Sequence, residues 1–370
     1  MTKPMRLAEF QILPPRVRGH VSDGLAVAID RVATAAAPSH RFLRFGWYAA
    51  ALEAYGGAAR TLVVDEEGRP TLALPFVDVG PRVLGFTAVP GCYWPFRSFV
   101  LSEGAGRATI RAALATLATT VTALRIGPLD DDDAAAGPLL AAARAAGWGV
   151  LDRFVADSWR FDLGAARRGG EWPRGSTLRK NRFHEKHLAD HGALEWQSLR
   201  GGEVVAAFDA FAAVEARSWI GARTDGSDAK FTATGHGAFW RAAALDPGVA
   251  AMLRGALLRV DGVPAAFSFD IEAGTTRYAI ANSYDPVFAR CSAGKLLQYR
   301  NLVRAADDGV ETIDWGAGDS GYKQVIGATR GPALRDWLLL RPGLPAGVGR
   351  LAAGLWRRSG RQPVAAGGPT

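Results

Sequence analysis

The chain has 370 residues, 48% of them hydrophobic, and a formal net charge of +8. This length exceeds the usual size of one domain, so we expect two domains that share an interface. The basic charge favours an anionic partner such as a cofactor phosphate, a nucleic acid or an acidic glycan, although many soluble proteins carry such a charge without one. The only two cysteines, Cys92 and Cys291, exclude a disulfide framework and suit a reducing compartment.

No targeting or membrane-spanning segment is predicted. Charged residues and prolines interrupt every apolar run of the N-terminal leader, so it does not resemble a signal peptide. The longest uncharged helical run, between Arg111 and Arg125, has 13 residues, fewer than the ~20 that span a bilayer. No zinc-binding spacing occurs. We therefore expect a cytoplasmic protein without a transmembrane segment and without a metal.

The first half of the chain alternates helices with hairpins. Apolar residues from Phe42 to Leu52 predict a helix that ends near Gly56, and strands at 61–64 and 71–77 form a β-hairpin. An aromatic loop, PGCYWPF, occupies 90–96. The other predicted elements are a strand at 83–89, a helix at about 107–122, a strand at 124–126, a helix ending at Gly147 and a strand at 154–161.

The second half repeats this pattern after a Gly/Arg-rich segment, 163–173, which we interpret as a linker. Its predicted elements are an amphipathic helix at 204–219, a helix containing Phe239, a hairpin with strands at 252–260 and 263–271, a strand at 275–284, a helix from Ser292 and a strand at 311–315. Because both halves run helix, hairpin, strand, helix, strand, the pattern predicts an α/β protein with a mixed sheet and a degenerate internal duplication. The expected units are 1–165 and 166–345, followed by a flexible tail, 346–370; a short basic amphipathic helix at Leu351 to Arg358 is the less common alternative for such an end.

The segment that follows the last predicted hairpin carries an anion-binding signal. Ser292 is a suitable N-cap, and Gly309 is a suitable end for the helix. A helix start presents unpaired N–H groups and the positive end of a dipole, which suit a phosphate or pyrophosphate. The residues expected to hold it are Arg290, Ser292, Ala293, Gly294 and Lys295.

This order of elements resembles the acyl-CoA-binding half of the GNAT acyltransferase superfamily, and within it the CelD-like acetyltransferase branch, which is related to the FemAB peptidyltransferases. The motifs that carry the resemblance are Tyr284-Asp285-Pro286, Ser292 to Leu297, Asp314 to Asp319, Tyr322-Lys323, Ser176 to Arg182 and Ser218-Trp219. The resemblance implies two tandem GNAT-like units, of which the second binds acetyl-CoA or another acyl-CoA. It also implies direct transfer of the acyl group to an amine or hydroxyl acceptor.

Tyr322 is the residue that the resemblance marks as catalytic, because a tyrosine after the matching strand of GNAT enzymes commonly protonates the departing CoA thiolate. A phenol suits this role since it stays protonated at neutral pH. The other interpretation is a tyrosine that packs its ring and leaves its hydroxyl in water. Asp314 and Asp319, near one edge of the sheet, are the candidate bases. Two weaker base candidates are Glu215, expected on an exposed helix face, and Asp270, expected to be solvated.

A basic run lies near the start of the second unit. Arg179, Lys180 and Arg182, together with Lys323 beside the catalytic tyrosine, are expected to bind the acceptor or cofactor phosphates, whereas a solvated helix face is the simpler interpretation of the run. The acceptor is a small molecule, a glycan or a peptide. Two alternatives stay open: a FemAB-like transferase that uses aminoacyl-tRNA, and a non-catalytic module in polysaccharide or envelope assembly.

A literal G-x-G-x-x-G also occurs, at Gly316, Gly318 and Gly321. A dinucleotide site would need a helix directly after it and an acidic residue about 20 positions further on. The following YKQVIGATRGP instead contains two more glycines and a proline. The sequence therefore argues against dinucleotide binding.

Overall fold

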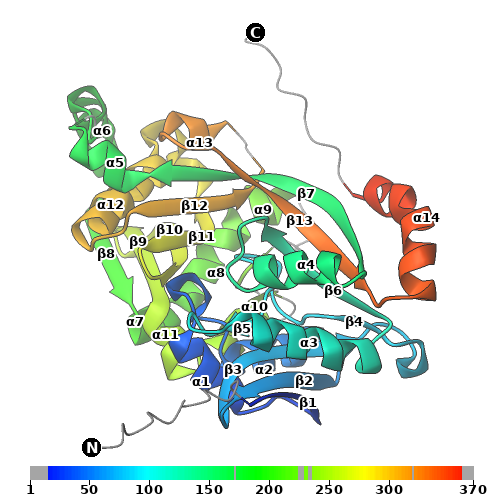
Figure 1. Ribbon diagram of the computed structural model, residues 1–370. Helices are drawn as coiled ribbons and strands as arrows, with labels where there is room; N and C mark the ends of the chain where they lie inside the picture. Colours follow the sequence, from blue (N-terminus) through cyan, green and yellow to red (C-terminus); the bar gives the residue numbers. More distant parts are fainter. Residues whose placement is uncertain (1–15, 171, 224–228, 232–235, 319–320, 361–370) are drawn as a thin grey trace, which may run out of the picture.

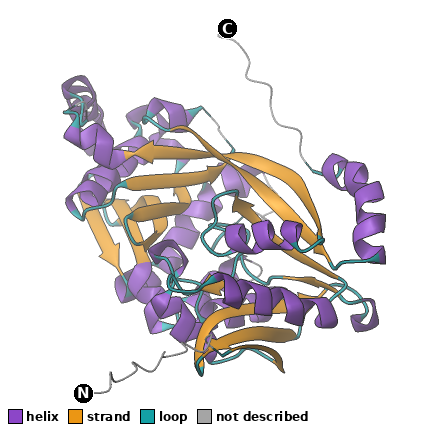
Figure 2. Cartoon of the chain, in the orientation of Figure 1, coloured by secondary structure: helices purple, strands orange, loops and turns teal. Residues whose placement is uncertain are grey.

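The computed structural model of the protein describes residues 16–170, 172–223, 229–231, 236–318 and 321–360. Its strands form one mixed sheet with helices packed against it (Figures 1 and 2). The elements of the first half are β1 (Val17–Asp23), α1 (Ala28–Ala35), η1 (Pro38–His40), α2 (Phe45–Tyr55), β2 (Ala59–Glu66), β3 (Arg69–Asp78), η2 (Arg82–Leu84), β4 (Phe86–Ala88), β5 (Val100–Leu101), α3 (Arg107–Thr120), β6 (Ala123–Asp130), α4 (Ala136–Ala145) and β7 (Gly149–Asp162).

The second half continues the same sheet. Its elements are α5 (Leu163–Arg168), α6 (Gly175–Ala189), β8 (Leu194–Arg200), α7 (Gly202–Ala206), α8 (Phe208–Arg217), α9 (Trp219–Arg223), α10 (His236–Ala243), α11 (Pro247–Met252), β9 (Leu253–Val260), β10 (Val263–Ala273), β11 (Thr276–Tyr284), η3 (Pro286–Cys291), α12 (Ala293–Asp307), β12 (Thr312–Ala317), α13 (Tyr322–Val325), β13 (Thr329–Leu340) and α14 (Leu344–Arg358). Both predicted hairpins are confirmed, as β2–β3 and β9–β10.

The order of the strands is nearly symmetric about the centre of the sheet, with the outer strands of the first half on one side and those of the second half on the other. It runs β1-β2-β3-β4-β6-β13-β7-β12-β11-β10-β9-β8, with β5 paired to β3. Each half contributes an antiparallel run that ends in one parallel pair, β4 with β6 and β11 with β12. The predicted mixed α/β class is confirmed, and the strand order has the symmetry expected of two tandem units.

The innermost strands are exchanged between the halves. The last strand of the first half, β7, pairs with β12 of the second half, whereas β13 pairs with β6 of the first half; β7 and β13 pair with each other at the centre. Hydrogen bonds of the sheet therefore cross the centre of the molecule in both directions. The division at residue 165 stays a prediction about how the chain is organised, because no gap in the sheet marks it.

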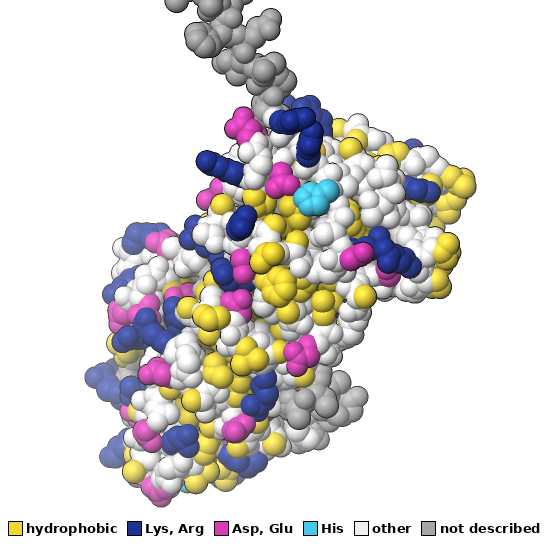
Figure 3. All heavy atoms as spheres, turned by 90° about the horizontal axis from the view of Figure 1, so that it is seen from below, with side chains coloured by type: hydrophobic (Ala, Val, Ile, Leu, Met, Phe, Trp, Pro, Cys, Tyr) yellow, Lys and Arg dark blue, Asp and Glu magenta, His cyan; other side chains and the backbone are white. Residues whose placement is uncertain are grey.

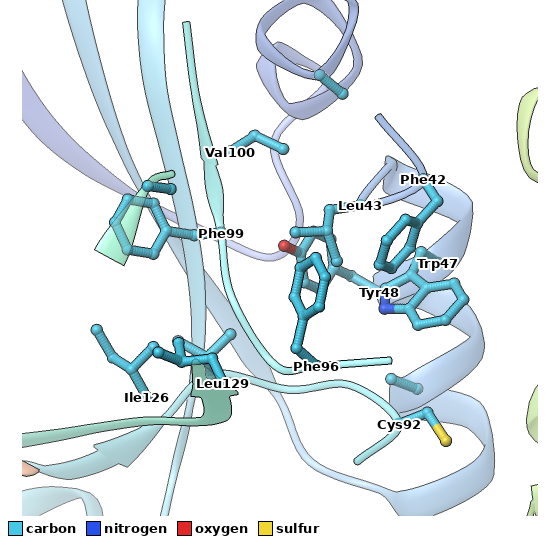
Figure 4. Close-up of a cluster of buried hydrophobic side chains, with 14 of the residues drawn as sticks. Phe42, Leu43, Trp47, Tyr48, Cys92, Phe96, Phe99, Val100, Ile126 and Leu129 are labelled. Atoms are coloured by element: carbon cyan, nitrogen blue, oxygen red, sulfur yellow. The ribbon is translucent and has the colours of Figure 1, made fainter. Parts of the chain in front are cut away.

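A continuous aromatic core joins the halves. Trp47 of α2 packs edge-on against Trp240 of α10, with ring centroids 5.5 Å apart, and Trp240 packs against Phe269 of β10 at 4.9 Å. Figure 4 shows the first-half part of this core, where the ring of Phe42 packs against the rings of Trp47 and Phe96. Because these rings are buried, the core fixes the position of one half against the other.

The prediction of a linker at 163–173 is wrong for its first part. Residues Leu163–Arg168 form α5, and the Asp162 carboxylate caps this helix by accepting a hydrogen bond from the N–H of Ala165 at 2.7 Å. Leu163 is fully buried. The Gly/Arg-rich composition that suggested a linker thus hides a capped helix with a buried anchor.

Candidate active site

The parallel strands β11 and β12 separate part-way along their length. Their pairing covers Thr276 to Tyr278 on β11 and Thr312 to Asp314 on β12, but β11 continues to Tyr284. At the point of separation β11 also has a bulge, since Ala279 and Ala281 oppose consecutive residues of β10. The backbone of β11 beyond Tyr278 is therefore not paired with β12, and a split opens between the two strands.

Helix α12 begins beside the far end of β11. Its first turn follows Ser292, whose φ of +56° places it in the left-handed region, and its side chain makes no capping hydrogen bond. The predicted helix start is confirmed, although the predicted side-chain cap is absent. The ring of Tyr284, the last residue of β11, covers Gly294 so closely that a Cβ there would lie 2.6 Å from the ring. The free N–H groups of the first turn thus lie at the mouth of the split.

The two cations predicted to flank this helix start are accessible. Arg290 is exposed and Lys295 is half-buried, and neither takes part in a hydrogen bond or ion pair between side chains in the part of the chain that the structure describes. Positive charge and a helix N-terminus therefore coincide at this point, as an anionic group requires.

The basic run forms α6, which packs beside this helix start, against α12 and η3, and projects from the body at the upper left of Figure 1. Leu188 anchors the helix in the core, and Glu185 accepts a hydrogen bond from Arg300 of α12 at 2.6 Å. Arg179, Lys180 and Arg182 are exposed, with no ion pair among the described residues. The structure thus brings this predicted cluster next to the predicted phosphate site.

Trp94, in the aromatic loop of the first half, fills the base of the split. Its indole Nε1 donates a hydrogen bond to the carbonyl oxygen of Ala279 on β11 at 2.8 Å. On the other side, the ring lies so close to Gly316 of β12 that a Cβ there would approach it within 2.8 Å. Gly316 also has a φ of +63°, which favours glycine. One side chain therefore spans the two separating strands.

Asp314 is buried where the strands separate. Its Oδ2 accepts a hydrogen bond from Arg160 Nε at 2.7 Å, and its Oδ1 accepts one from the N–H of Gly316 at 2.8 Å. Arg160, on the exchanged strand β7, also donates to Asp130 at 2.6 Å. Burial raises the pKa of Asp314, while Arg160 favours its charged form. A role as base would require Asp314 to give up one of these partners.

The remaining predicted site residues follow β12. Asp319 lies outside the described residues, as does the side chain of Tyr322, whose backbone begins α13. Lys323 is buried, and its Nζ donates to the carbonyl oxygens of Trp315 at 2.8 Å and Gly318 at 2.5 Å. Its ammonium group therefore holds the turn after β12, and an anion would have to compete with these carbonyls.

Two expectations about carboxylates are wrong, because both groups are buried. Glu215 accepts hydrogen bonds from the backbone N–H groups of Lys230 at 2.9 Å and Phe231 at 3.0 Å. Asp270 accepts one from Asn301 of α12 at 2.8 Å, and burial raises its pKa to about 6. Glu215 therefore holds the backbone of Lys230 and Phe231, and Asp270 links α12 to the sheet.

Trp94, Arg160 and Tyr93 had no predicted role. Tyr93 lies beside Trp94 in the aromatic loop, and its hydroxyl is 3.1 Å from Lys230 Nζ. The sequence feature that could have indicated a role for Tyr93 and Trp94 is the aromatic loop at 90–96, because adjacent aromatic residues between glycine and proline are unusual on a surface. Its position against the second half depends on the tertiary arrangement.

In the first half, the corresponding pair β4 and β6 also separates, but the loop that follows β4 closes the gap. The N–H of Val89 donates to the carbonyl of Arg125, Arg97 N–H donates to Pro128, and the N–H of Gly127 donates back to Arg97, all at 3.0–3.1 Å. Main-chain hydrogen bonds therefore connect β4 and β6 beyond their paired residues, whereas the pairing of β11 with β12 ends at Tyr278 and Asp314.

Comparisons with known proteins agree with this geometry. Residues 175–324 match the family model described as an acetyltransferase (GNAT) domain. No protein of the curated collection searched matches the chain. Among solved structures, FemX is 12% identical with a TM-score of 0.56, covering 90% of this chain and 100% of FemX.

Two further structures share the fold. A conserved protein of unknown function from Bacteroides thetaiotaomicron is 12% identical, with a TM-score of 0.55 over 87% of this chain and 100% of that one. The C-terminal domain of an Agrobacterium fabrum protein described as an inferred lysylphosphatidylglycerol synthetase is 15% identical. Its TM-score is 0.51, and the match covers 91% of this chain and 98% of that domain. These similarities do not distinguish the CelD-like branch, which stays a prediction. Residues 175–324 are thus similar to a GNAT-type acetyltransferase domain, and the chain as a whole has a fold similar to that of FemX.

Proposed function

We propose that the protein is an acyltransferase that moves an acetyl or other short acyl group from acyl-CoA to an amine or hydroxyl acceptor. The observation that carries this proposal is the split between β11 and β12, with a bulge at its origin and the start of α12 at its mouth. A long, thin donor with phosphates at one end and a thioester at the other matches a narrow gap that has positive charge at one end.

The donor would lie along the split. Its pyrophosphate would accept hydrogen bonds from the first turn of α12, with Arg290 and Lys295 beside it, and its pantetheine arm would use the unpaired backbone of β11. Holding both ends of the donor fixes the thioester for direct attack, so most of the catalysis is positioning.

The thioester end would point at Trp94. Because the indole spans β11 and β12, the space beyond it is closed, which favours a short acyl group. Tyr322, at the start of α13, would protonate the departing thiolate. Asp314 or Asp319 would accept the proton of the attacking group. Burial raises the pKa of Asp314, which favours proton uptake, but Asp314 would first have to give up Arg160 or the N–H of Gly316.

The acceptor would approach over α6. Arg179, Lys180 and Arg182 project from this helix next to η3 and α12, at the phosphate end of the proposed donor. The negative charge of an acceptor, whether a small molecule, a glycan or a peptide, would be held there, and its reacting group would have to reach along the split to the thioester.

The same helix supports the second candidate, an aminoacyl-tRNA-dependent transferase. A projecting row of exposed cations suits a nucleic-acid backbone as well as it suits a small anion, and the fold is similar to that of FemX. The third candidate, a non-catalytic module in polysaccharide or envelope assembly, needs neither donor.

Thermal unfolding with and without acetyl-CoA tests the proposal. A ligand that binds only the folded state stabilises it by mass action, so we expect acetyl-CoA to raise the melting temperature at moderate salt. The acetyl thioester of N-acetylcysteamine, which lacks the phosphates, is the matched control and should give a much smaller shift.

Binding of tRNA at two salt concentrations separates the candidates. A tRNA contact neutralises many phosphates, so its affinity should collapse between low and physiological salt, whereas the CoA effect should persist. No shift with acetyl-CoA, together with saturable and salt-sensitive tRNA binding, would favour aminoacyl-tRNA as the donor. No response to either ligand would favour the binding module.

A further inference from the structure

The helix α14 exposes an apolar stripe at the end of the molecule opposite α6 (Figure 1). Leu344, Val348, Leu351 and Leu355 are spaced by four, three and four residues, which places them on one side of the helix. These four side chains are between 55% and 89% exposed. An aligned row of large apolar side chains differs from the single exposed leucines that are normal on a protein surface.

The other side of α14 is firmly attached. Gly349 packs so closely against Leu340 of β13 that any side chain at this position would overlap it. The ring of Trp356 lies under the Arg153 guanidinium at 4.3 Å, and Arg357 pairs with a carboxylate of β7, Asp152, at 3.3 Å. Because these contacts fix the rotation of the helix about its axis, the apolar stripe faces away from the protein.

A second exposed apolar segment lies at the same end of the sheet. It is the loop around η2, whose side chains are between 44% and 90% exposed: Val79, Val83, Leu84 and Phe86. Both segments meet at Thr122, since the N–H of Thr122 donates to the carbonyl of Gly85 at 2.8 Å and the N–H of Arg341 donates to the carbonyl of Thr122 at 3.1 Å. Figure 3, which keeps the right side of Figure 1 on the right, shows hydrophobic side chains along this margin.

The charge of α14 and the turn before it is positive. Residues 341–360 contain four arginines and no acidic residue, and the carboxylates that contact the two segments are paired, Asp152 with Arg357 and Asp23 with Arg82. Arg341, Arg350 and Arg358 are exposed. A second copy of the chain would bring an equally positive surface to this face, so its charge opposes self-association. An anionic lipid surface instead offers phosphates for the arginines and an apolar layer for the leucines.

We propose that α14 and the η2 loop together form a docking surface for the face of a membrane rich in anionic phospholipid. The stripe enters the boundary between headgroups and acyl chains, and the arginines lie at the level of the phosphates. The helix lies along the surface rather than across the bilayer, and the described residues include no helix long and apolar enough to cross it. This docking is independent of the acyltransferase proposal.

Co-sedimentation with vesicles tests the proposal. The full chain should bind vesicles that contain phosphatidylglycerol and phosphatidylcholine, bind pure phosphatidylcholine vesicles much more weakly, and lose affinity as salt rises. The double variant Leu351→Glu/Leu355→Glu should bind the anionic vesicles at least about 10-fold more weakly, because two apolar anchors become charged. Leu245→Glu/Val263→Glu, which changes two exposed apolar residues elsewhere, is the matched control and should bind like the wild type.

Three outcomes would overturn the proposal. They are no binding of the wild type to anionic vesicles, equal binding by the Leu351/Leu355 variant and the wild type, and equal loss of binding in the control variant. Light scattering on the same proteins identifies the rival occupant. A dimer that the Leu351/Leu355 variant dissociates, without vesicle binding, would assign the stripe to a second copy of the chain.

Discussion

The two parallel strand pairs of this protein share a topology but differ in what lies between them. The gap between β4 and β6 is closed by main-chain hydrogen bonds from the loop that follows β4. The gap between β11 and β12 is filled at its base by a single side chain, Trp94, and that side chain comes from the loop that closes the first gap. The second half thus has a gap between its parallel strands, and a loop of the first half fills the base of that gap.

The largest expected effect concerns chemistry at the open pair. If Tyr322 protonates the thiolate, Tyr322→Phe should lower turnover about 10²-fold while the melting shift with acetyl-CoA is kept. A buried tyrosine of the first half, Tyr48, whose hydroxyl donates to the carbonyl of Ser98 at 2.9 Å in the core, is the control for loss of a phenol hydroxyl. Tyr48→Phe should reduce stability without a change in turnover of the folded protein. Equal turnover in wild type and Tyr322→Phe would show that the Tyr322 hydroxyl does not act as the acid and that the side chain only packs.

Gly294→Asp tests the helix start at the open pair. A carboxylate there would face the donor phosphates, and we expect acetyl-CoA affinity to fall at least about 10-fold relative to Gly294→Asn. Asparagine is the proper control because both side chains disturb Tyr284 equally and only one is charged.

The corresponding change in the first half sharpens the comparison. Gly106, the N-cap of α3, has open space where a Cβ would be. Gly106→Asp should leave CoA affinity unchanged and stabilise α3 slightly, because aspartate is a good N-cap. Loss of CoA affinity in Gly106→Asp would place the donor in the first half, and similar affinity in Gly294→Asp and Gly294→Asn would remove the α12 site.

Trp94→Ala would make the base of the open gap deeper. We expect the ratio of kcat/KM for hexanoyl-CoA to that for acetyl-CoA to rise about 10-fold, since the removed indole frees space in line with the split. Trp94→Phe keeps most of the ring and should keep the preference of the wild type. The alanine variant also creates a cavity that costs about 3 kcal/mol or more, so assays belong well below its melting temperature. An unchanged ratio would show that Trp94 does not limit the length of the acyl group.

Much of the frame was predictable from the sequence. Alternating apolar residues gave the hairpins β2–β3 and β9–β10, and the small-residue turn after Ser292 gave the start of α12. Local pattern carries this information because hairpins and helix ends depend on neighbours in the chain.

What the sequence did not reveal depends on contacts between distant residues. The exchange of β7 and β13 leaves no local signal, because a strand's own pattern does not name its partner. Asp270 was expected to be solvated because aspartates usually are. It is buried instead, and Asn301, 31 positions away in the sequence, donates a hydrogen bond to its carboxylate. Gly316 is part of the G-x-G-x-x-G sequence that resembles a dinucleotide motif. A glycine is needed at this position because the ring of Trp94, from the other half, packs against it.

Charge reversal on α6 should have a moderate effect. Arg179→Glu/Lys180→Glu/Arg182→Glu should raise the KM for the acceptor several-fold and change the acetyl-CoA melting shift less, because the start of α12, Arg290 and Lys295 would still hold the donor phosphates. Reversal of three exposed arginines of the first half, Arg16, Arg18 and Arg69, is the control for net charge. A similar KM in the two variants would show that the cations of α6 are solvated and do not bind the acceptor.

The smallest expected effect is on stability, at the buried carboxylate between β10 and α12. Burial raises the pKa of Asp270 from 3.8 to about 6. The folded state therefore holds this proton more tightly than the unfolded state, so the stabilisation is complete below pH about 4 and is lost as pH rises through 6. At neutral pH the ionised group costs up to about 3 kcal/mol.

Asp270→Asn should therefore raise the melting temperature by a few degrees at pH 7.5 and leave it unchanged at pH 4.5, where the wild-type carboxyl is already protonated. The amide can still accept the hydrogen bond from Asn301 and donate to Ser268, so the packing of α12 on β10 is kept. Asp209→Asn, at an exposed ion pair with Arg241, is the control and should shift the melting temperature little at either pH. A lower melting temperature for Asp270→Asn at pH 7.5 would mean that the ionised carboxylate stabilises the interface between α12 and the sheet, through the nearby Arg277.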